Sequence, residues 1–178
     1  MSKPQAKAWG RPIIEKLSLV EAMSWILIDY IMSKVKALYH IVFCTKGRQM
    51  TLPLVHIEDL YRYIWKEITL LKCRLIRIGG IQNHVHMLVE LHPSVALSKL
   101  MQNVKSYSSG WMRSDGRFPL FIGWANEYYA STISSDRQND IVEYIKGQRE
   151  HHNYTSFDKE LKSLCSMIDA GCDDGFLM

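Results

Sequence analysis

Apolar residues alternate with a period of two in two long stretches of the chain, which is the pattern of β-strands. In residues 36–44 both alternating sets are apolar, so this strand is expected at the centre of a sheet and buried on both faces. Two shorter strands are also predicted, and Gly79-Gly80 predicts a hairpin turn between the second strand and the third. The four predicted strands are 36–44, 74–78, 81–91 and 127–133.

Between these strands, apolar residues recur at steps of three or four, which is the spacing of one face of a helix. In residues 54–71 this stripe contains Leu60, Ile64 and Ile68. A polar turn after the last long helix leads to a short C-terminal helix and an acidic tail. The long helices are expected over 13–30, 54–71, 95–111 and about 135–152.

The order of these elements predicts the fold class. It reads strand, helix, strand, strand, helix, strand, helix, which is typical of an α+β protein with the ferredoxin-like split β-α-β plait. The plait has an antiparallel sheet, and here one C-terminal helix is added to it. A fold of this kind hosts many activities and does not by itself identify a function.

Composition narrows the class of protein without identifying its activity. The chain has 178 residues, 47% of them hydrophobic and 22% charged, which excludes a disordered or collagen-like chain. The net charge of +4 allows an anionic partner without requiring one, and the basic excess falls on residues 32–157.

Signals for export, membrane insertion or zinc-finger formation are missing from the sequence. The longest apolar candidate, residues 13–31, is interrupted by charged residues and is too polar to span a membrane. The four cysteines lack metal-binding spacing and are expected to be reduced thiols. We therefore expect a soluble cytoplasmic protein.

Two pairs of residues could carry chemistry. His84 and His86 project from the same face of a strand with Cβ atoms ~7 Å apart, close enough to bind one cation. Tyr144 and Gln148 lie one helical turn apart, and an amide oxygen is a reasonable ligand for Mg²⁺ or Mn²⁺. Each pair could equally be structural, as hydrogen-bonded histidines on a half-exposed strand and as a surface Tyr–Gln pair.

Three motifs in sequence order carry a resemblance to a known family. They are Leu38-Tyr39-His40-Ile41-Val42-Phe43-Cys44-Thr45-Lys46-Gly47-Arg48, Asn83-His84-Val85-His86, and Glu143-Tyr144-Ile145-Lys146-Gly147-Gln148-Arg149-Glu150-His151-His152. They resemble the single-tyrosine HUH transposases of the smallest bacterial insertion sequences. This IS200-like family includes relatives associated with repetitive extragenic palindromes.

The resemblance implies an activity and a set of site residues. Family members bind a single-stranded DNA hairpin, cut near it, and rejoin the DNA through a 5′-phosphotyrosine. Carried onto this chain, Tyr144 is the nucleophile on the last long helix, and His84, His86 and Gln148 hold Mg²⁺ or Mn²⁺. Family members work as homodimers, often with the tyrosine helix of one subunit completing the site of the other.

Several positions depart from the family pattern or compete with it. Gly147 stands where the family more often has asparagine, and a glycine could loosen the helix that aims Gln148. Tyr128 and Tyr129 are rival tyrosines, but they lie in a predicted strand and lack a glutamine one turn later. We interpret them as packing or base-stacking residues.

DNA contact is expected from basic residues that neutralise phosphates and from aromatic rings that stack on unpaired bases. The basic candidates are Lys46, Arg48, Arg74, Arg77, Lys99, Lys105 and Arg113. The aromatic candidates are Tyr107, Trp111 and Trp124.

The sequence also predicts three parts of the chain and leaves alternative functions open. Residues 1–31 form an extension, expected to be helical and without a family counterpart, residues 32–157 the transposase domain, and residues 158–178 a short helix and acidic tail. One alternative is a domesticated or inactive hairpin-binding protein that does not cleave DNA. Another is a replication or conjugation nicking enzyme, which the short chain disfavours.

Overall fold

The computed structural model describes residues 35–152 and 154–167, and all of them belong to one compact unit that spans residues 35–178. The helix expected over 13–30 and the whole extension 1–31 lie outside the described residues. No described helix is both long enough and apolar enough to cross a membrane.

The described strands form one four-stranded antiparallel sheet in the order β2-β3-β1-β4. The strands are β1 (Ala37–Cys44), β2 (Arg74–Ile81), β3 (His84–Leu91) and β4 (Tyr129–Ile133). Because β1 and β2 are both antiparallel to β3, which lies between them, they run parallel to each other. This is the split β-α-β topology, so the predicted fold class is confirmed.

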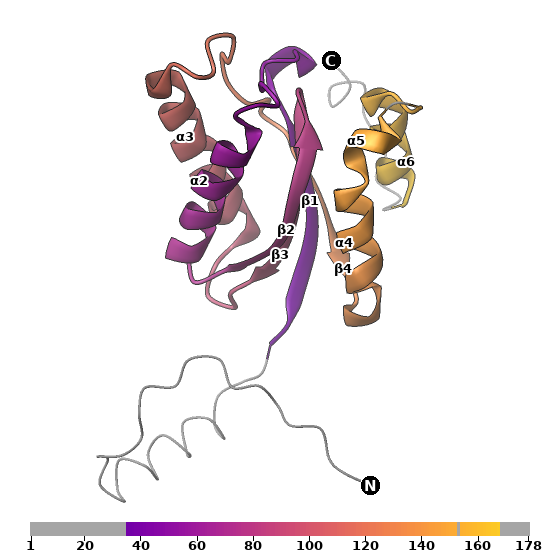
Figure 1. The fold of residues 1–178 in the computed structure, drawn as a ribbon. Helices are drawn as coiled ribbons and strands as arrows, with labels where there is room; N and C mark the ends of the chain where they lie inside the picture. The colour runs from indigo at the N-terminus through magenta and orange to yellow at the C-terminus, as the bar shows by residue number, and fades with distance from the viewer. Residues whose placement is uncertain (1–34, 153, 168–178) are drawn as a thin grey trace, which may run out of the picture. The chain divides into compact units, whose positions relative to one another are not determined.

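Helices cover both faces of this sheet (Figure 1). One layer contains α2 (Ile57–Leu70) and α3 (Leu97–Asp115), and the other contains α4 (Gln138–Lys146), α5 (Gln148–His151) and α6 (Phe157–Met167). The main apolar core lies beneath α2 and α3, where strand residues such as Val85 and Met87 are fully buried. The alternate residues of β3 therefore face α4–α6, which is the face that carries the two histidines.

The predicted hairpin turn at Gly79-Gly80 is wrong. Strand β2 continues to Ile81, and the turn falls on the next two residues. Gly79 pairs with His86 in the sheet, and a Cβ atom on Gly79 would lie 2.6 Å from the carbonyl oxygen of Ile145 on α4. The glycine is therefore needed because a helix approaches the strand closely, and not because the chain turns there.

The single long helix predicted over about 135–152 is divided. A short 3-10 turn (Ser135–Arg137) precedes α4, and Gly147 separates α4 from α5. The Gly147 N–H still donates to the Glu143 carbonyl at 3.0 Å, and the Gly147 carbonyl accepts from the His151 N–H at 2.9 Å. The break is therefore mild, and Tyr144 and Gln148 keep their one-turn spacing.

The expectation for the cysteines is only partly right. Cys44 and Cys73 are free thiols. Cys165, on α6, is disulfide-bonded, so the expectation of a reduced thiol is wrong there.

Candidate active site

The two histidines of β3 are fully buried beneath α4–α6. His84 and His86 have no exposed surface, and their ring centroids lie 5.0 Å apart. They are therefore not the half-exposed histidines of the structural alternative. The alternation read from the sequence correctly put both on one face of the strand.

Hydrogen bonds fix the Nδ1 side of each ring. His84 Nδ1 lies 2.8 Å from the Asn83 side-chain oxygen, and His86 Nδ1 lies 3.1 Å from His40 Nε2. With Nδ1 engaged, the Nε2 atom of each histidine is directed away from the strand, and such a bond commonly orients a metal-binding imidazole.

Tyr144 and Gln148 reach the same place from the helical layer. The Tyr144 ring centroid lies 5.7 Å from that of His86 and 5.8 Å from that of His40. Gln148 is 1% exposed and donates a hydrogen bond from Nε2 to Glu160 Oε1 at 3.0 Å. One chain thus brings all four predicted site residues together.

Glu160, which sequence reasoning missed, lies at the centre of this cluster. Its Oε1 atom accepts hydrogen bonds from the hydroxyl of Tyr144 and from Gln148. Its Oε2 atom lies 2.9 Å from His152 Nε2 and 3.7 Å from His84 Nε2. Glu160 belongs to α6, beyond the predicted boundary of the transposase domain at residue 157.

The missed residues differ in the signal that the sequence offered. His152 follows Gln148 at i+4, so helical spacing could have found it. His40 is a polar residue in a strand that is otherwise apolar, and it is 2% exposed. Glu160 carries no comparable signal, because its place depends on how α6 packs.

Burial decides the charge of the ring nitrogens and of the phenol. Burial and the neighbouring His86 lower the pKa of His84, and burial also lowers the pKa of His86, so both rings stay neutral, the form that binds metals. Burial and the hydrogen bond to Glu160 raise the pKa of Tyr144, which stays protonated. Burial alone would raise the pKa of Glu160, but the nearby His86 ring and hydrogen bonds from Tyr144 and Gln148 lower it.

The donor atoms in this cluster fit a divalent cation. His86 Nε2 and Gln148 Oε1 are buried and have no hydrogen-bond partner among the described residues, which is costly for atoms with free lone pairs. The ligand atoms of His84, His152 and Glu160 all lie within 4.8 Å of one another. Imidazole nitrogens, an amide oxygen and a carboxylate are all common metal ligands.

A cavity of about 570 Å³ opens beside Tyr144. It lies between β4, α4 and α6, and Tyr144, His40 and Glu160 are among the residues that line it. Arg137 and Lys159 also line it and supply positive charge. A phosphate could therefore approach the tyrosine hydroxyl from this side.

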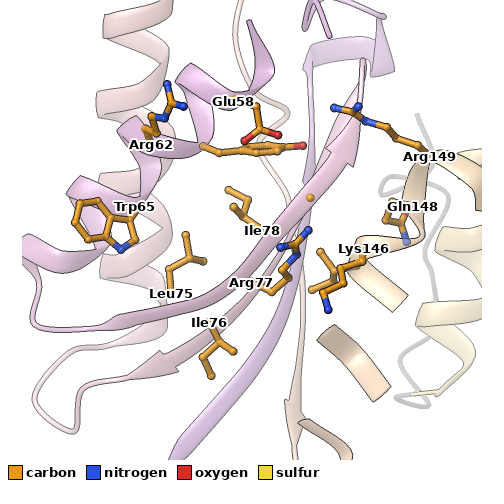
Figure 2. A pocket seen from close by; sticks show the side chains of 13 residues that line it. Glu58, Arg62, Trp65, Leu75, Ile76, Arg77, Ile78, Lys146, Gln148 and Arg149 are labelled. Atoms are coloured by element: carbon orange, nitrogen blue, oxygen red, sulfur yellow. The ribbon is translucent and has the colours of Figure 1, made fainter. Parts of the chain in front are cut away.

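A second hollow, of about 520 Å³, lies along β2 at the edge of the sheet (Figure 2). It reaches Gln148 at one end, and the half-exposed Trp65 lies at the other. Four basic side chains surround it. They are Arg62, Arg77, Lys146 and Arg149.

The other predicted DNA contacts are spread over the surface. Lys46, Lys105 and Arg113 line a groove of about 870 Å³ beside α3. In contrast, Arg48 is ion-paired with Asp158 and Arg74 with Glu90. Lys99 is exposed on α3.

The aromatic candidates and the rival tyrosines differ in their burial and in what they pack against. Trp124 packs against Phe43 in the core, whereas Tyr107 is exposed. Trp111 is partly buried and stacks on Tyr63, with ring centroids 4.8 Å apart. Tyr128 lines the groove beside α3, and Tyr129 is buried, with its ring in a T-shaped arrangement with that of His40.

Known proteins resemble this chain in sequence and in fold. The family described as "Transposase IS200 like" matches residues 33–148. Transposases for insertion sequence element IS200 from Salmonella typhimurium and Salmonella typhi are each 28% identical over 124 residues, covering 63% of this chain and 76% of each relative.

Two solved structures share the fold. A putative transposase from Deinococcus radiodurans has a TM-score of 0.53 at 23% identity, over 65% of this chain and 93% of its own. A REP-associated tyrosine transposase, solved bound to a REP hairpin, has a TM-score of 0.54 at 14% identity, over 70% of this chain and 76% of its own. Together these matches define the chain as a transposase. It belongs to the IS200-like transposase family.

Proposed function

We propose that the protein binds single-stranded DNA hairpins and cleaves and rejoins DNA by transesterification through Tyr144. The supporting observation is the buried cluster in one chain, where Tyr144 lies beside His86 of β3 and His40 of β1 and lines a cavity. A tyrosine that only packed against the sheet would need neither the cavity nor the buried ligand atoms beside it that lack a hydrogen-bond partner among the described residues.

In the cleavage step, the Tyr144 oxygen forms a bond to phosphorus and the bond from phosphorus to the 3′ oxygen breaks. The phenolic proton already points at the Glu160 carboxylate, so it has an acceptor. The departing 3′ oxygen takes up a proton from water and leaves as a 3′-OH, and the proton accepted by Glu160 returns to water. Attack by the 3′-OH of another strand reverses the step, so no hydrolysis and no ATP are needed.

His84, His86 and Gln148 would hold Mg²⁺ or Mn²⁺ at this site. When bound, the cation polarises the scissile phosphate. Burial of both histidines keeps water and competing protons away from their Nε2 atoms.

The hollow along β2 suits the DNA backbone. The basic side chains that line this hollow would neutralise DNA phosphates, and the exposed Trp65 ring offers a surface for base stacking. We also propose a homodimer that acts on DNA in the cytoplasm. The dimer need not share its active sites, since one chain already supplies Tyr144 and both histidines.

A trapping experiment tests the activity. The protein is incubated with labelled hairpin DNA from the flanks of its own gene and with Mg²⁺ or Mn²⁺, and the mixture is run on a denaturing gel. We expect a covalent adduct that Tyr144→Phe abolishes and that Tyr128→Phe leaves unchanged. An adduct that persists in Tyr144→Phe would contradict the assignment. Hairpin binding without an adduct would favour the domesticated binding protein.

A further inference from the structure

We infer that His152 and Glu160 bind the same cation as the histidine pair of β3, so that the C-terminal helix α6 completes the metal site. This inference rests on the proposed metal-dependent function and assigns two ligands that the family resemblance did not supply. It also implies a preference for Mn²⁺ over Mg²⁺.

The separations between donor atoms are those of ligands around one ion. His84 Nε2 lies 3.1 Å from His152 Nε2, and Glu160 Oε2 lies 2.9 Å from His152 Nε2 and 3.7 Å from His84 Nε2. Adjacent ligands with bonds of about 2.1 Å lie roughly 3.0–3.5 Å apart. Two imidazole nitrogens and a carboxylate oxygen therefore lie within about 0.2 Å of the spacing that a bound ion requires.

The charge of Glu160 also favours a bound cation. The Glu160 side chain is 2% exposed, and no lysine or arginine within residues 35–152 and 154–167 forms an ion pair with it. A buried carboxylate that is surrounded by imidazoles and neutral donors is costly. A divalent cation at Oε2 offsets that cost and leaves Oε1 to accept from Tyr144 and Gln148.

The two additional ligands are held in place from outside the site. His152 Nδ1 lies 2.8 Å from the Thr155 carbonyl, which leaves Nε2 for a cation. Helix α6 is docked beside the site because Phe157 stacks on the His84 ring, with centroids 4.1 Å apart. Leu161 and Leu164 pack in an apolar cluster under the same helix. Glu160 is thus presented to the site by a packed element.

The ligand chemistry favours Mn²⁺. Imidazole nitrogens bind manganese and later transition metals better than magnesium, which prefers oxygen ligands and water. A site that contains His84, His86 and His152 with one carboxylate should therefore bind Mn²⁺ more tightly than Mg²⁺.

Mn²⁺ binding to the purified full-length protein tests the inference. Free Mn²⁺ is measured by its electron paramagnetic resonance signal during a titration, with and without excess Mg²⁺. We expect Glu160→Gln and His152→Ala each to weaken binding by about tenfold or more, and Glu160→Asp to bind between Glu160→Gln and wild type. Pulsed resonance should count one fewer coordinated imidazole nitrogen in His152→Ala. The matched controls, Glu67→Gln and His92→Ala, lie outside the site and should bind as the wild type does.

The outcomes separate this inference from the proposed function. If His84→Ala loses Mn²⁺ while Glu160→Gln and His152→Ala bind as tightly as wild type, the added ligands are wrong and the metal-dependent activity stands. If the wild type binds no Mn²⁺, both proposals fail. Thermal unfolding without metal shows whether each variant folds. If Glu160→Gln does not fold, Mn²⁺ binding by Glu160→Asp is compared with that of the wild type instead.

Discussion

The carbonyl oxygen of Ile145 on α4 occupies the space beside Gly79, 2.6 Å from where a Cβ atom would be. Gly79 lies opposite His86 in the sheet, and Ile145 follows Tyr144 in the helix. This contact therefore sets how far the tyrosine lies from the histidines. A single glycine allows the helix that carries Tyr144 to rest on strand β2.

Gly79→Ala should push α4 away from β2. Crowding a packed contact of this kind costs about 1–3 kcal/mol, and the displacement also moves Tyr144 and Gln148. Urea unfolding should show the loss of stability, and the covalent adduct should form more slowly. Gly110→Ala is the matched control, because no described residue comes within 4 Å of its Cβ position in α3. A Gly79→Ala protein that equals wild type in both measurements would contradict this role.

Gly147→Ala should stabilise the protein and leave cleavage unchanged. A Cβ atom there would lie 3.6 Å from its nearest neighbour, which is ordinary contact, and the backbone at Gly147 has negative φ. Replacing a glycine near a helix with alanine typically gains up to about 1 kcal/mol. The free energy of unfolding and the rate of adduct formation check this. A slower reaction in a more stable protein would mean that the break between α4 and α5 is a functional hinge.

These cases show how much the sequence could predict. The alternation of β3 placed His84 and His86 on one face, and helical spacing placed Gln148 above Tyr144, because both patterns are local. The fold class followed from the order of strands and helices along the chain. These features needed no knowledge of which distant segments touch.

The errors arose where distant segments meet. Gly79-Gly80 has the composition of a turn, but the approach of α4 is what requires Gly79 within the strand. At Gly80, with φ of +154°, a Cβ atom would instead collide with the carbonyl oxygen of His84. Glu160 reaches the histidines through the docking of α6, which its own sequence does not specify. Long-range contacts therefore decided both the role of Gly79 and the place of Glu160 beside the histidines.

Metal-free protein should lose stability as the pH falls below about 6.5. Burial and the neighbouring His86 lower the pKa of His40 to about 3, and burial also lowers those of His84 and His86. The unfolded chain takes up protons on these rings near pH 6.5 and the folded chain does not. The stabilisation is therefore fully present above pH 6.5 and decreases below it, by about 1.4 kcal/mol per pH unit for each ring.

Urea unfolding between pH 7 and pH 5, with a chelator present, measures this slope. His40→Gln can still bond to His86 but does not titrate, so the slope should fall by the contribution of one proton. An unchanged slope in His40→Gln would mean that His40 does not remain neutral in the folded protein.

Arg77→Ala should weaken binding of single-stranded DNA more than Arg74→Ala does. Both arginines are exposed on β2, but Arg74 is already paired with Glu90, whereas Arg77 forms no ion pair with any residue in the part of the chain that the structure describes. An unpaired arginine releases a counterion when it neutralises a phosphate, so its loss should reduce the salt dependence of the binding constant by about 0.7 in logarithmic slope. Fluorescence anisotropy with a labelled strand at several salt concentrations gives both quantities. If Arg74→Ala has the larger effect, the bound DNA strand runs past the other end of β2, away from Gln148.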